Sequence, residues 1–316
     1  MARLKEYNGH YCESEYEYAF IGFLETEGWK YTSGNKLSRV TKRDELIEDD
    51  FKKFIADGNL DLTEDEVTQI CDTVRLVGAE SDFATLHKVY NWLVDGIQFT
   101  PKDGIARMIP LINFEKDGVK NIFRVVNQFT VEYTNNGQKE NRRPDVILFV
   151  NGMPLCIMEL KNPADANATI YDAWEQINIR YWRDIPHLLH YCPLACISDG
   201  VKTRLGTVRT PYEHFYAWRR VNEGDVVSTL PFAETETMIK GVYTPERFVE
   251  IFRDYIYFQD SIYDSDEVEI VCRYPQFFAA RLLKQSIVDS VVTKSGRGGT
   301  YFGATGCGKT YTMAFL

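Results

Sequence analysis

The sequence lacks any run of about 20 apolar residues, the length that a membrane-spanning helix requires. Its first residues, MARLKEYNGHYCESEYEY, also lack the apolar core of a signal peptide. No internal repeat and no low-complexity tract is present. We therefore expect a cytoplasmic protein with no membrane among its partners.

Paired cysteine motifs are missing as well. The seven cysteines are scattered, and Cys192 and Cys196 form a single CxxxC without a second pair. Structural zinc sites almost always have four ligands. We therefore interpret the cysteines as reduced, mostly buried thiols.

Positive charge is scarce, since 36 lysines and arginines face 46 aspartates and glutamates and give a formal net charge of −10. This balance argues against a protein that coats DNA. It is compatible with a nuclease, because such a site concentrates carboxylates and needs only a local basic strip to contact DNA.

Apolar periodicity divides the 316 residues into two blocks. Residues 13–28 and most of residues 40–95 have helical spacing, and Thr63 and Glu66 form a capping box. Runs rich in Val, Ile and Phe from residue 107 to 160 predict strands, followed by a helix at about 168–183 and a strand near 194–200. These patterns predict an α/β chain with a mixed sheet flanked by helices, and a second block that begins near residue 243.

The segment RRPDVILFVNGMPLCIMELKNP, residues 142–163, has the pattern of a β-hairpin with charges inside an apolar run. Glu159 and Lys161 are two residues apart, so they project from the same face of a strand. If Asn151-Gly152-Met153 is a three-residue loop, Asp145 lies opposite Glu159. Two carboxylates and one ammonium group then meet on one patch.

Such a patch suits the hydrolysis of a phosphodiester. Mg²⁺ prefers carboxylate oxygens, and it lowers the pKa of its bound water and neutralises developing charge. Lys161 could hold or deprotonate the attacking water, or stabilise the transition state. The alternative is a surface hairpin with an ordinary Glu–Lys ion pair. The catalytic interpretation is favoured because these charges interrupt a run that otherwise indicates a buried strand, where charges are costly.

The hairpin resembles the PD-(D/E)xK nuclease superfamily. Together with the upstream VVNQFTVEY, it is similar to the R (restriction/translocation) subunit of type I restriction–modification enzymes. This resemblance covers most of the chain and implies a PD-(D/E)xK endonuclease domain, an α+β core, over residues 1–240 with a helical insertion at about 40–95. It also implies that Asp145 and Glu159 bind the metal and that Lys161 is the catalytic lysine.

The family also uses a glutamate from its first helix as a metal ligand. Three glutamates of the first predicted helix are candidates, Glu17 first and then Glu15 or Glu13. A solvated helix glutamate is the alternative for each of them.

The family further has a Gln-x-x-x-Tyr element on the helix after the hairpin, which makes Gln176 and Tyr181 candidate catalytic residues. Here the two residues are five apart rather than four. Five residues turn a helix by about 500°, so the side chains would diverge by about 140°. Either the helix ends or bulges before Tyr181, or Arg180 takes the facing position.

Residues 303–310, GATGCGKT, match the phosphate-binding loop GxxxxGK[ST]. We expect a short strand at residues 298–302 before it, Lys309 on the β- and γ-phosphates of ATP, and Thr310 on Mg²⁺. In superfamily 2 helicase-type motors, a glutamine placed like Gln276 reads adenine; an exposed polar residue near a helix start is the alternative. The candidate ATP-binding residues are Gly303, Thr305, Gly306, Gly308, Lys309, Thr310 and Gln276. Residues 241–316 would then be the truncated start of a first RecA-like motor domain.

The resemblance implies an ATP-driven translocase that cuts double-stranded DNA and works with modification and specificity subunits. The candidate DNA contacts near the hairpin are Arg142, Arg143, Arg180 and Arg183, and a solvated arginine is the alternative for each. Two other functions remain open. One is a docking module of a motor subunit with an inactive nuclease fold, and the other is a nuclease–helicase of DNA repair.

The first prediction concerns ATP. The sequence ends six residues after Thr310, and no Walker B acid or second motor lobe follows the loop, so we expect an N-terminal piece of a longer protein. We predict that this chain does not hydrolyse ATP at a steady-state rate above background in a coupled assay. A measurable rate that Lys309→Ala abolishes would contradict this prediction.

Overall fold

The computed structural model describes residues 13–77, 81–162, 169–228, 230, 232–259 and 267–316. Its helices are α1 Glu13–Thr26, η1 Gly34–Lys36 (3₁₀), α2 Glu48–Gly58, α3 Glu64–Arg75, α4 Asp82–Asp95, α5 Ile170–Glu175, η2 Gln176–Tyr181 (π), α6 Trp182–Asp184, α7 Pro186–Leu189, η3 Tyr212–His214 (3₁₀), α8 Ala233–Val242, α9 Pro245–Asp254, α10 Tyr274–Thr293 and α11 Lys309–Ala314. Its strands are β1 Lys30–Ser33, β2 Ile97–Phe99, β3 Arg107–Ile109, β4 Phe123–Asn127, β5 Val131–Asn135, β6 Gln138–Arg142, β7 Val146–Val150, β8 Met153–Leu160, β9 Leu194–Ser198, β10 Thr203–Thr207, β11 Ile256–Gln259 and β12 Val268–Val271.

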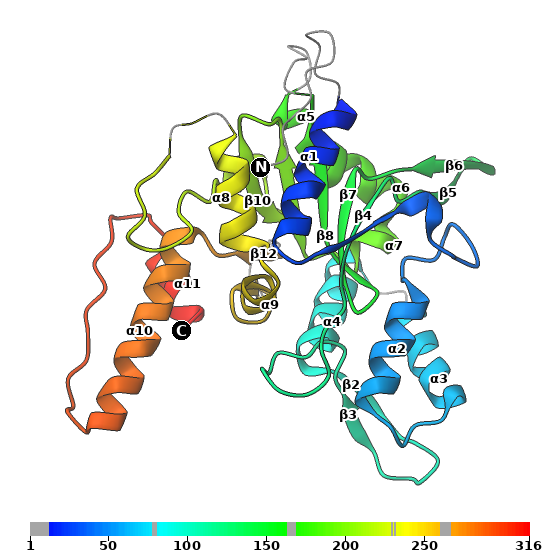
Figure 1. Ribbon diagram of the computed structural model, residues 1–316, viewed down its shortest axis with the longest axis horizontal. Coiled ribbons are helices and arrows are strands. Elements are labelled where there is room, and N and C mark those ends of the chain that lie inside the picture. Colours follow the sequence, from blue (N-terminus) through cyan, green and yellow to red (C-terminus); the bar gives the residue numbers. More distant parts are fainter. Residues whose placement is uncertain (1–12, 78–80, 163–168, 229, 231, 260–266) are drawn as a thin grey trace.

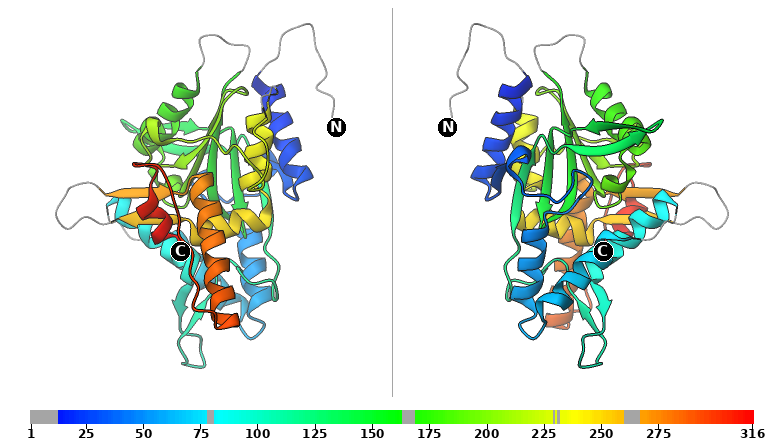
Figure 2. Two further views of the ribbon diagram at one scale, coloured as in Figure 1. Left: turned by 90° about the vertical axis from the view of Figure 1, so that its left-hand side faces the viewer. Right: turned by 90° about the vertical axis from the view of Figure 1, so that its right-hand side faces the viewer.

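The centre of the structure is a six-stranded sheet with the order β1-β4-β7-β8-β9-β10 (Figure 1). β1 and β4 are parallel, as are β8 and β9, whereas the other neighbours are antiparallel. Figure 2 shows the sheet between α1 and α8 on one side and α5 to α7 on the other. The expected α/β class, with a mixed sheet flanked by helices, is confirmed.

Strand alternation sorts the side chains of β7 and β8 between the two faces of the sheet. The side chains in the cluster that contains α1 and α8 include Val146, Leu148, Met158 and Leu160. Those in the cluster that contains α5 and η2 include Ile147, Phe149 and Ile157. Asp145 and Glu159 have the parity of the second group, so they face the layer formed by α5 and η2.

The loop of the β7–β8 hairpin is shorter than expected. Val150 pairs with Met153, so the loop is the dipeptide Asn151-Gly152 and the predicted three-residue loop is wrong. The two loop residues have φ values of 51° and 78°, as in a type I′ turn. This turn matches the right-handed twist of the two strands.

A β-bulge in β8 restores the predicted register beyond the loop. Leu155 is the extra residue that has no partner in β7. Past the bulge, Val146 pairs with Met158, and the next position outward sets Asp145 beside Glu159. The predicted juxtaposition of the two carboxyl groups is therefore confirmed, although it is reached by a two-residue turn and a bulge.

The insertion at residues 40–95 is largely helical, as predicted, and comprises α2, α3 and α4. The capping box of Thr63 and Glu66 is present at the start of α3. Arg124 in β4 ties the insertion to the sheet, since its guanidinium donates two hydrogen bonds to Asp50 in α2 at 2.6 and 2.7 Å. This bidentate pair fixes α2 against the edge of the sheet.

Residues after 240 share a core with the preceding block. Phe248 in α9 packs edge-to-face on Trp29, with ring centroids 5.4 Å apart, and Phe277 and Phe315 belong to the same apolar cluster as α1. The parallel sheet of a RecA-like domain is not among the described elements. The domain boundary at 240 and the motor assignment therefore stay predictions.

The strand expected at residues 298–302 is not formed. Residues 294–308, all of which the structure describes, lie outside helices and strands, and Phe302 is exposed. A strand needs a neighbour to pair with its backbone groups, and none of the described strands pairs with these residues. The loop is followed directly by α11.

Among the described helices, none is both long and apolar enough to cross a membrane. The described cysteines are free thiols; Cys307 is half-buried and the others are buried.

The second prediction compares two glycines in equivalent Asn-Gly turns. Gly152 and Gly137 have φ values of 78° and 79°, but a Cβ on Gly152 would collide with the Ile47 carbonyl and lie 2.8 Å from the Phe51 nitrogen, whereas a Cβ on Gly137 meets nothing. Gly137→Ala should cost about 1–2 kcal/mol of unfolding free energy from backbone strain alone. Gly152→Ala should cost about 3 kcal/mol or more, because the collision adds to the strain. Equal losses in urea denaturation would contradict this account.

Candidate active site

The site is built on the carboxyl pair of Asp145 and Glu159 where β7 begins and β8 ends. Asp145 Oδ2 accepts a hydrogen bond of 2.8 Å from the Leu160 amide, and the Asp145 amide lies 3.4 Å from Glu159 Oε1. Both side chains are buried, and Glu159 has no exposed surface. The backbone of the hairpin thus holds the two acids together away from solvent.

Burial makes the ionised forms of both acids unfavourable. It raises the pKa of Asp145, and it raises the pKa of Glu159 strongly, with the nearby Asp145 as the next cause. Glu159 Oε2 is buried and makes no hydrogen bond with any described residue. Negative charge on this oxygen is therefore unfavourable unless a cation lies close to it.

Lys161 supplies part of this positive charge. Its Nζ lies 4.0 Å from Glu159 Oε2 and donates a hydrogen bond of 2.9 Å to Gln176 Oε1. The ammonium group is largely buried and is held between the carboxylate and the amide. The predicted common face of Glu159 and Lys161 is confirmed.

A π-helical turn resolves the unusual spacing of Gln176 and Tyr181. Residues 176–181 form η2, whose wider turn brings positions five apart onto one side. Gln176 Nε2 donates to the Tyr181 hydroxyl at 2.8 Å, and that hydroxyl donates to Glu159 Oε1 at 2.6 Å. Of the alternatives that the spacing left open, the bulged helix is the one observed.

Tyr181 keeps its proton in this setting. Its burial, and next the charge of Glu159, raise the pKa of the phenol well above its ordinary value. The hydroxyl is therefore a lasting donor to Glu159 Oε1. It leaves the other oxygen, Oε2, as the one directed to Lys161.

Glu17 is buried, but it lies in a different hydrogen-bond network. Its Oε1 accepts from Asn127 Nδ2 at 2.6 Å, and its Oε2 accepts from Gln128 Nε2 at 2.7 Å. The backbone amide of Gln128 also donates a hydrogen bond to the backbone carbonyl of Asp145 at 3.1 Å. Within the described part of the chain, no three His, Cys, Asp or Glu side chains are placed to hold one metal ion, so Glu17 does not join the carboxyl pair.

The other glutamates of the first helix add little. Glu15 is half-buried, and the side chain of Glu13 lies outside the described residues.

The two side-chain amides of Asn127 and Gln128, which hold Glu17, were not predicted from the sequence. The available signal was the polar pair directly after the apolar run of β4.

Two candidate DNA contacts, Arg142 and Arg183, converge on one acid. Arg142 Nε and Nη2 lie 2.7 and 2.6 Å from Asp184 Oδ2, and Arg183 Nε donates to Asp184 Oδ1 at 2.8 Å. The Arg142 guanidinium also lies over the ring of Tyr133. Arg142 therefore has a structural contact, whereas the Arg183 side chain remains 65% exposed.

The other two candidates are exposed. Arg180 pairs with Glu175 at 3.0 Å on the outside of the helix. Arg143 lies two residues before Asp145 and is open to solvent. Of the four arginines, Arg143 is thus the nearest in sequence to the carboxyl pair.

The phosphate-binding loop folds back on its own lysine. Lys309 Nζ donates to the carbonyls of Gly303 and Ala304, both at 2.9 Å. Gln276 is buried, so the exposed alternative for it is wrong, and its Nε2 donates to the Gly308 carbonyl at 3.1 Å. The remaining candidates in this loop, which are exposed or half-buried, are Thr305, Gly306 and Thr310.

Comparison with known proteins identifies the group to which this chain is related. Residues 11–214 match the family described as "Type I restriction enzyme R protein N terminus", and the chain belongs to that family. The resemblance to R subunits that the hairpin suggested is therefore confirmed.

Two relatives from different organisms show the extent of the similarity. The "Putative type I restriction enzyme MjaIXP endonuclease subunit" of Methanocaldococcus jannaschii is 30% identical over 95% of this chain and 30% of its own length. The type I restriction enzyme HindI endonuclease subunit of Haemophilus influenzae is 28% identical over 96% of this chain and 29% of its own length. The chain thus spans about 30% of the length of these curated relatives.

The third prediction follows from the carboxyl pair. The pKa values of Asp145 and Glu159 are raised above their ordinary values of 3.8 and 4.5, so above those values the folded chain binds more protons than the unfolded chain. Their contribution to the free energy of unfolding is therefore fully present at low pH and is lost as pH rises. Glu159→Gln removes one of these titrations. In EDTA, urea denaturation should show the variant gaining stability relative to wild type from about pH 5 to about pH 8. A difference that stays constant over this range would contradict the burial argument.

Proposed function

We propose that this chain is the nuclease part of the R subunit of an ATP-dependent type I restriction enzyme and that it cleaves double-stranded DNA with Mg²⁺. The observation that carries the proposal is the buried pair of Asp145 and Glu159 with Lys161 beside it. Its support is Glu159 Oε2, which accepts no hydrogen bond from a described residue and has the Lys161 ammonium group only at 4.0 Å, because a buried anion so weakly compensated is costly unless a cation joins it.

Asp145 and Glu159 would hold Mg²⁺ through hard carboxylate oxygens, which that ion prefers. When bound there, the ion neutralises charge on the scissile phosphate and lowers the pKa of a coordinated water. The Leu160 amide orients the Asp145 carboxylate, and the Tyr181 hydroxyl orients the Glu159 carboxylate. The other oxygen of each acid would then bind the metal ion.

Lys161 supplies the ammonium group that stands beside the carboxylates. From its position it can bind the attacking water or stabilise charge on the phosphate. Gln176 and Tyr181 act as positioning residues, since they contact Lys161 and Glu159 directly. The sequence analysis proposed a catalytic role for Gln176 and Tyr181; we now propose that they position Lys161 and Glu159.

We extend the proposal to the partners and the motor. The names of the relatives, which are endonuclease subunits of type I restriction enzymes, support a complex of several subunits and restriction over DNA repair. We propose that the other subunits supply modification and specificity. ATP would bind at residues 303–310, where its phosphates would replace the loop carbonyls as partners of Lys309. The contact of Gln276 with Gly308 is consistent with a base-reading residue held against this loop.

The fourth prediction tests catalysis. Asp145→Asn and Lys161→Ala should each lower plasmid cleavage by the protein, assembled with its modification and specificity subunits in ATP and Mg²⁺, by about 10²-fold or more. Lys240→Ala, which removes an exposed lysine of α8, is the matched control and should cleave like wild type. Unchanged cleavage in both site variants would leave the inactive docking module as the better account.

Metal binding gives the same prediction a readout besides activity. Mg²⁺ should raise the melting temperature of wild type more at about pH 8 than at about pH 5, because protons compete for the raised-pKa carboxylates. Asp145→Asn should lose this stabilisation, whereas Lys240→Ala should keep it. An equal Mg²⁺ effect in Asp145→Asn would place the cation elsewhere.

A further inference from the structure

One segment of this acidic chain is rich in positive charge. Residues 34–43, GNKLSRVTKR, contain four cationic side chains and no carboxylate, although the whole chain has a net charge of −10. The segment connects β1 to α2 and runs toward the β5–β6 hairpin (Figure 1). Sequence proximity to the catalytic hairpin could not reveal it, since about a hundred residues separate them.

Three contacts hold this segment along β5. Arg39 Nη2 donates to the Thr130 carbonyl at 2.6 Å, and the Lys42 carbonyl accepts from the Glu132 amide at 2.9 Å. Arg43 Nη2 donates to the Thr134 hydroxyl at 2.8 Å. The segment is therefore fixed to the hairpin by backbone and side-chain bonds.

The start of the segment lies against the neighbours of the catalytic Asp145. Gly34 packs so closely that a Cβ would lie 2.7 Å from the Asn127 carbonyl and 2.8 Å from that of Gln128. Gln128 in turn bonds to the backbone of Asp145. The end of β6 reaches Asp145 from the other direction through Arg143. The start of residues 34–43 and the end of β6 therefore both lie close to Asp145.

The cationic groups on this surface are accessible. The basic strip, as we define it, consists of the exposed residues Lys36, Lys42, Arg43, Lys139 and Arg143. Acids also lie nearby: Asp44 accepts a hydrogen bond from the Thr41 amide at 2.9 Å, Glu132 is 3.3 Å from Lys139, and Glu140 accepts hydrogen bonds from Tyr133 and Asn135. The strip keeps an excess of positive charge beside these acids.

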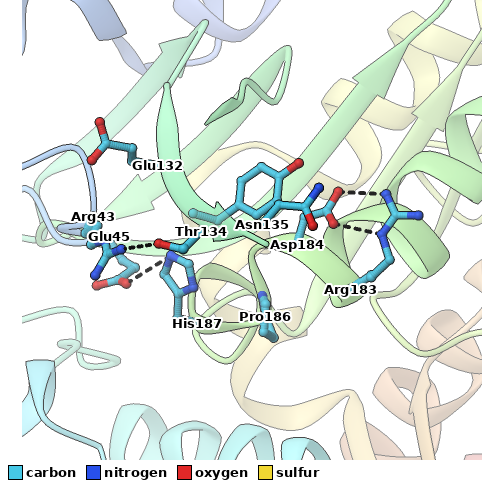
Figure 3. A pocket seen from close by; sticks show the side chains of 10 residues that line it. Arg43, Glu45, Glu132, Thr134, Asn135, Arg183, Asp184, Pro186 and His187 are labelled. Carbon is cyan, nitrogen blue, oxygen red and sulfur yellow. Dashed lines mark hydrogen bonds and ion pairs between the residues drawn. The ribbon is translucent and has the colours of Figure 1, made fainter. Parts of the chain in front are cut away.

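A pocket of about 810 Å³ separates the strip from α6 and α7. Figure 3 shows Arg43 on one side of it and Arg183 on the other. Glu45 also lines the pocket, but burial raises its pKa to about 7, so its negative charge is reduced near neutral pH. Arg183 faces the pocket from the other side, where Asp184 pairs with it at 2.8 Å, so the strip supplies the unpaired part of the positive charge here.

We propose that the basic strip binds the phosphate backbone of duplex DNA beside the cleavage site. The inference rests on the proposed nuclease function and names the surface that would hold its substrate. DNA carries one negative charge per about 1.7 Å of its axis, so it seeks a row of cations rather than a single one. Because the chain as a whole has a net charge of −10, attraction to DNA depends on local surfaces such as the strip, where cations outnumber acids.

The test measures binding of a fluorescent 30-mer duplex to this chain by anisotropy, without divalent cations and over a series of salt concentrations. The strip variant replaces Lys36, Lys42 and Arg43 with glutamine. The control variant makes the same charge change at Lys102, Lys116 and Lys120, which are exposed in the loops between β2 and β4. Far-ultraviolet circular dichroism and the melting temperature verify that both variants fold.

We expect the strip variant to bind at least about tenfold more weakly at low salt, and the slope of log K against log salt to fall by about 2 to 3. The control variant should retain at least half of the wild-type affinity and its slope. Equal losses in the two variants, an unchanged strip variant, or no duplex binding by wild type would each overturn the proposal.

Cleavage separates this inference from the function on which it rests. Asp145→Asn should lose cleavage and keep duplex binding, because it leaves the strip intact. Weak binding by the strip variant together with no cleavage by wild type in its assembly would retain the strip and reject the nuclease. Cleavage by the strip variant with wild-type KM and salt dependence would retain the nuclease and reject the strip.

Discussion

The structure depends on the enforced closeness of two buried carboxyl groups, Asp145 and Glu159. The ionised form of either acid alone would be unfavourable in an apolar layer, and each acid makes the ionisation of the other less favourable still. They meet because strand register is fixed by a two-residue turn and a bulge at Leu155. The Asn151-Gly152 turn packs against the start of α2. The helical insertion therefore helps to set the register that brings the two acids together at the opposite end of the hairpin.

The hydrogen bonds around the pair give its two acids different partners. The Asp145 carboxylate is held by the Leu160 amide, and the Glu159 carboxylate by the phenol of Tyr181. A π-turn makes the second contact available, because an ordinary helix would point Tyr181 elsewhere. The wider turn thus has a direct consequence for the site, which is typical of π-bulges.

Much of the site could be predicted from local pattern, because strand parity depends on the backbone alone. Parity correctly set Glu159 and Lys161 on one face, and the register correctly set Asp145 beside Glu159. The loop length was wrong, since a turn plus a bulge and a longer loop give the same register. The strand at residues 298–302 was also wrong, because strand formation depends on a neighbour and not on the segment itself.

The sequence by itself determined which residues share a face of the hairpin and where the GxxxxGK[ST] loop lies, because these patterns act over a few residues of backbone, and from them it predicted the type of chemistry. Only the tertiary structure decided how Gln176 and Tyr181 reach one side, that Glu17 lies in a separate amide network, and that residues 34–43 lie along β5. These outcomes depend on contacts between segments far apart in the chain. Such contacts follow from the packing of helices on a sheet, which no local periodicity encodes.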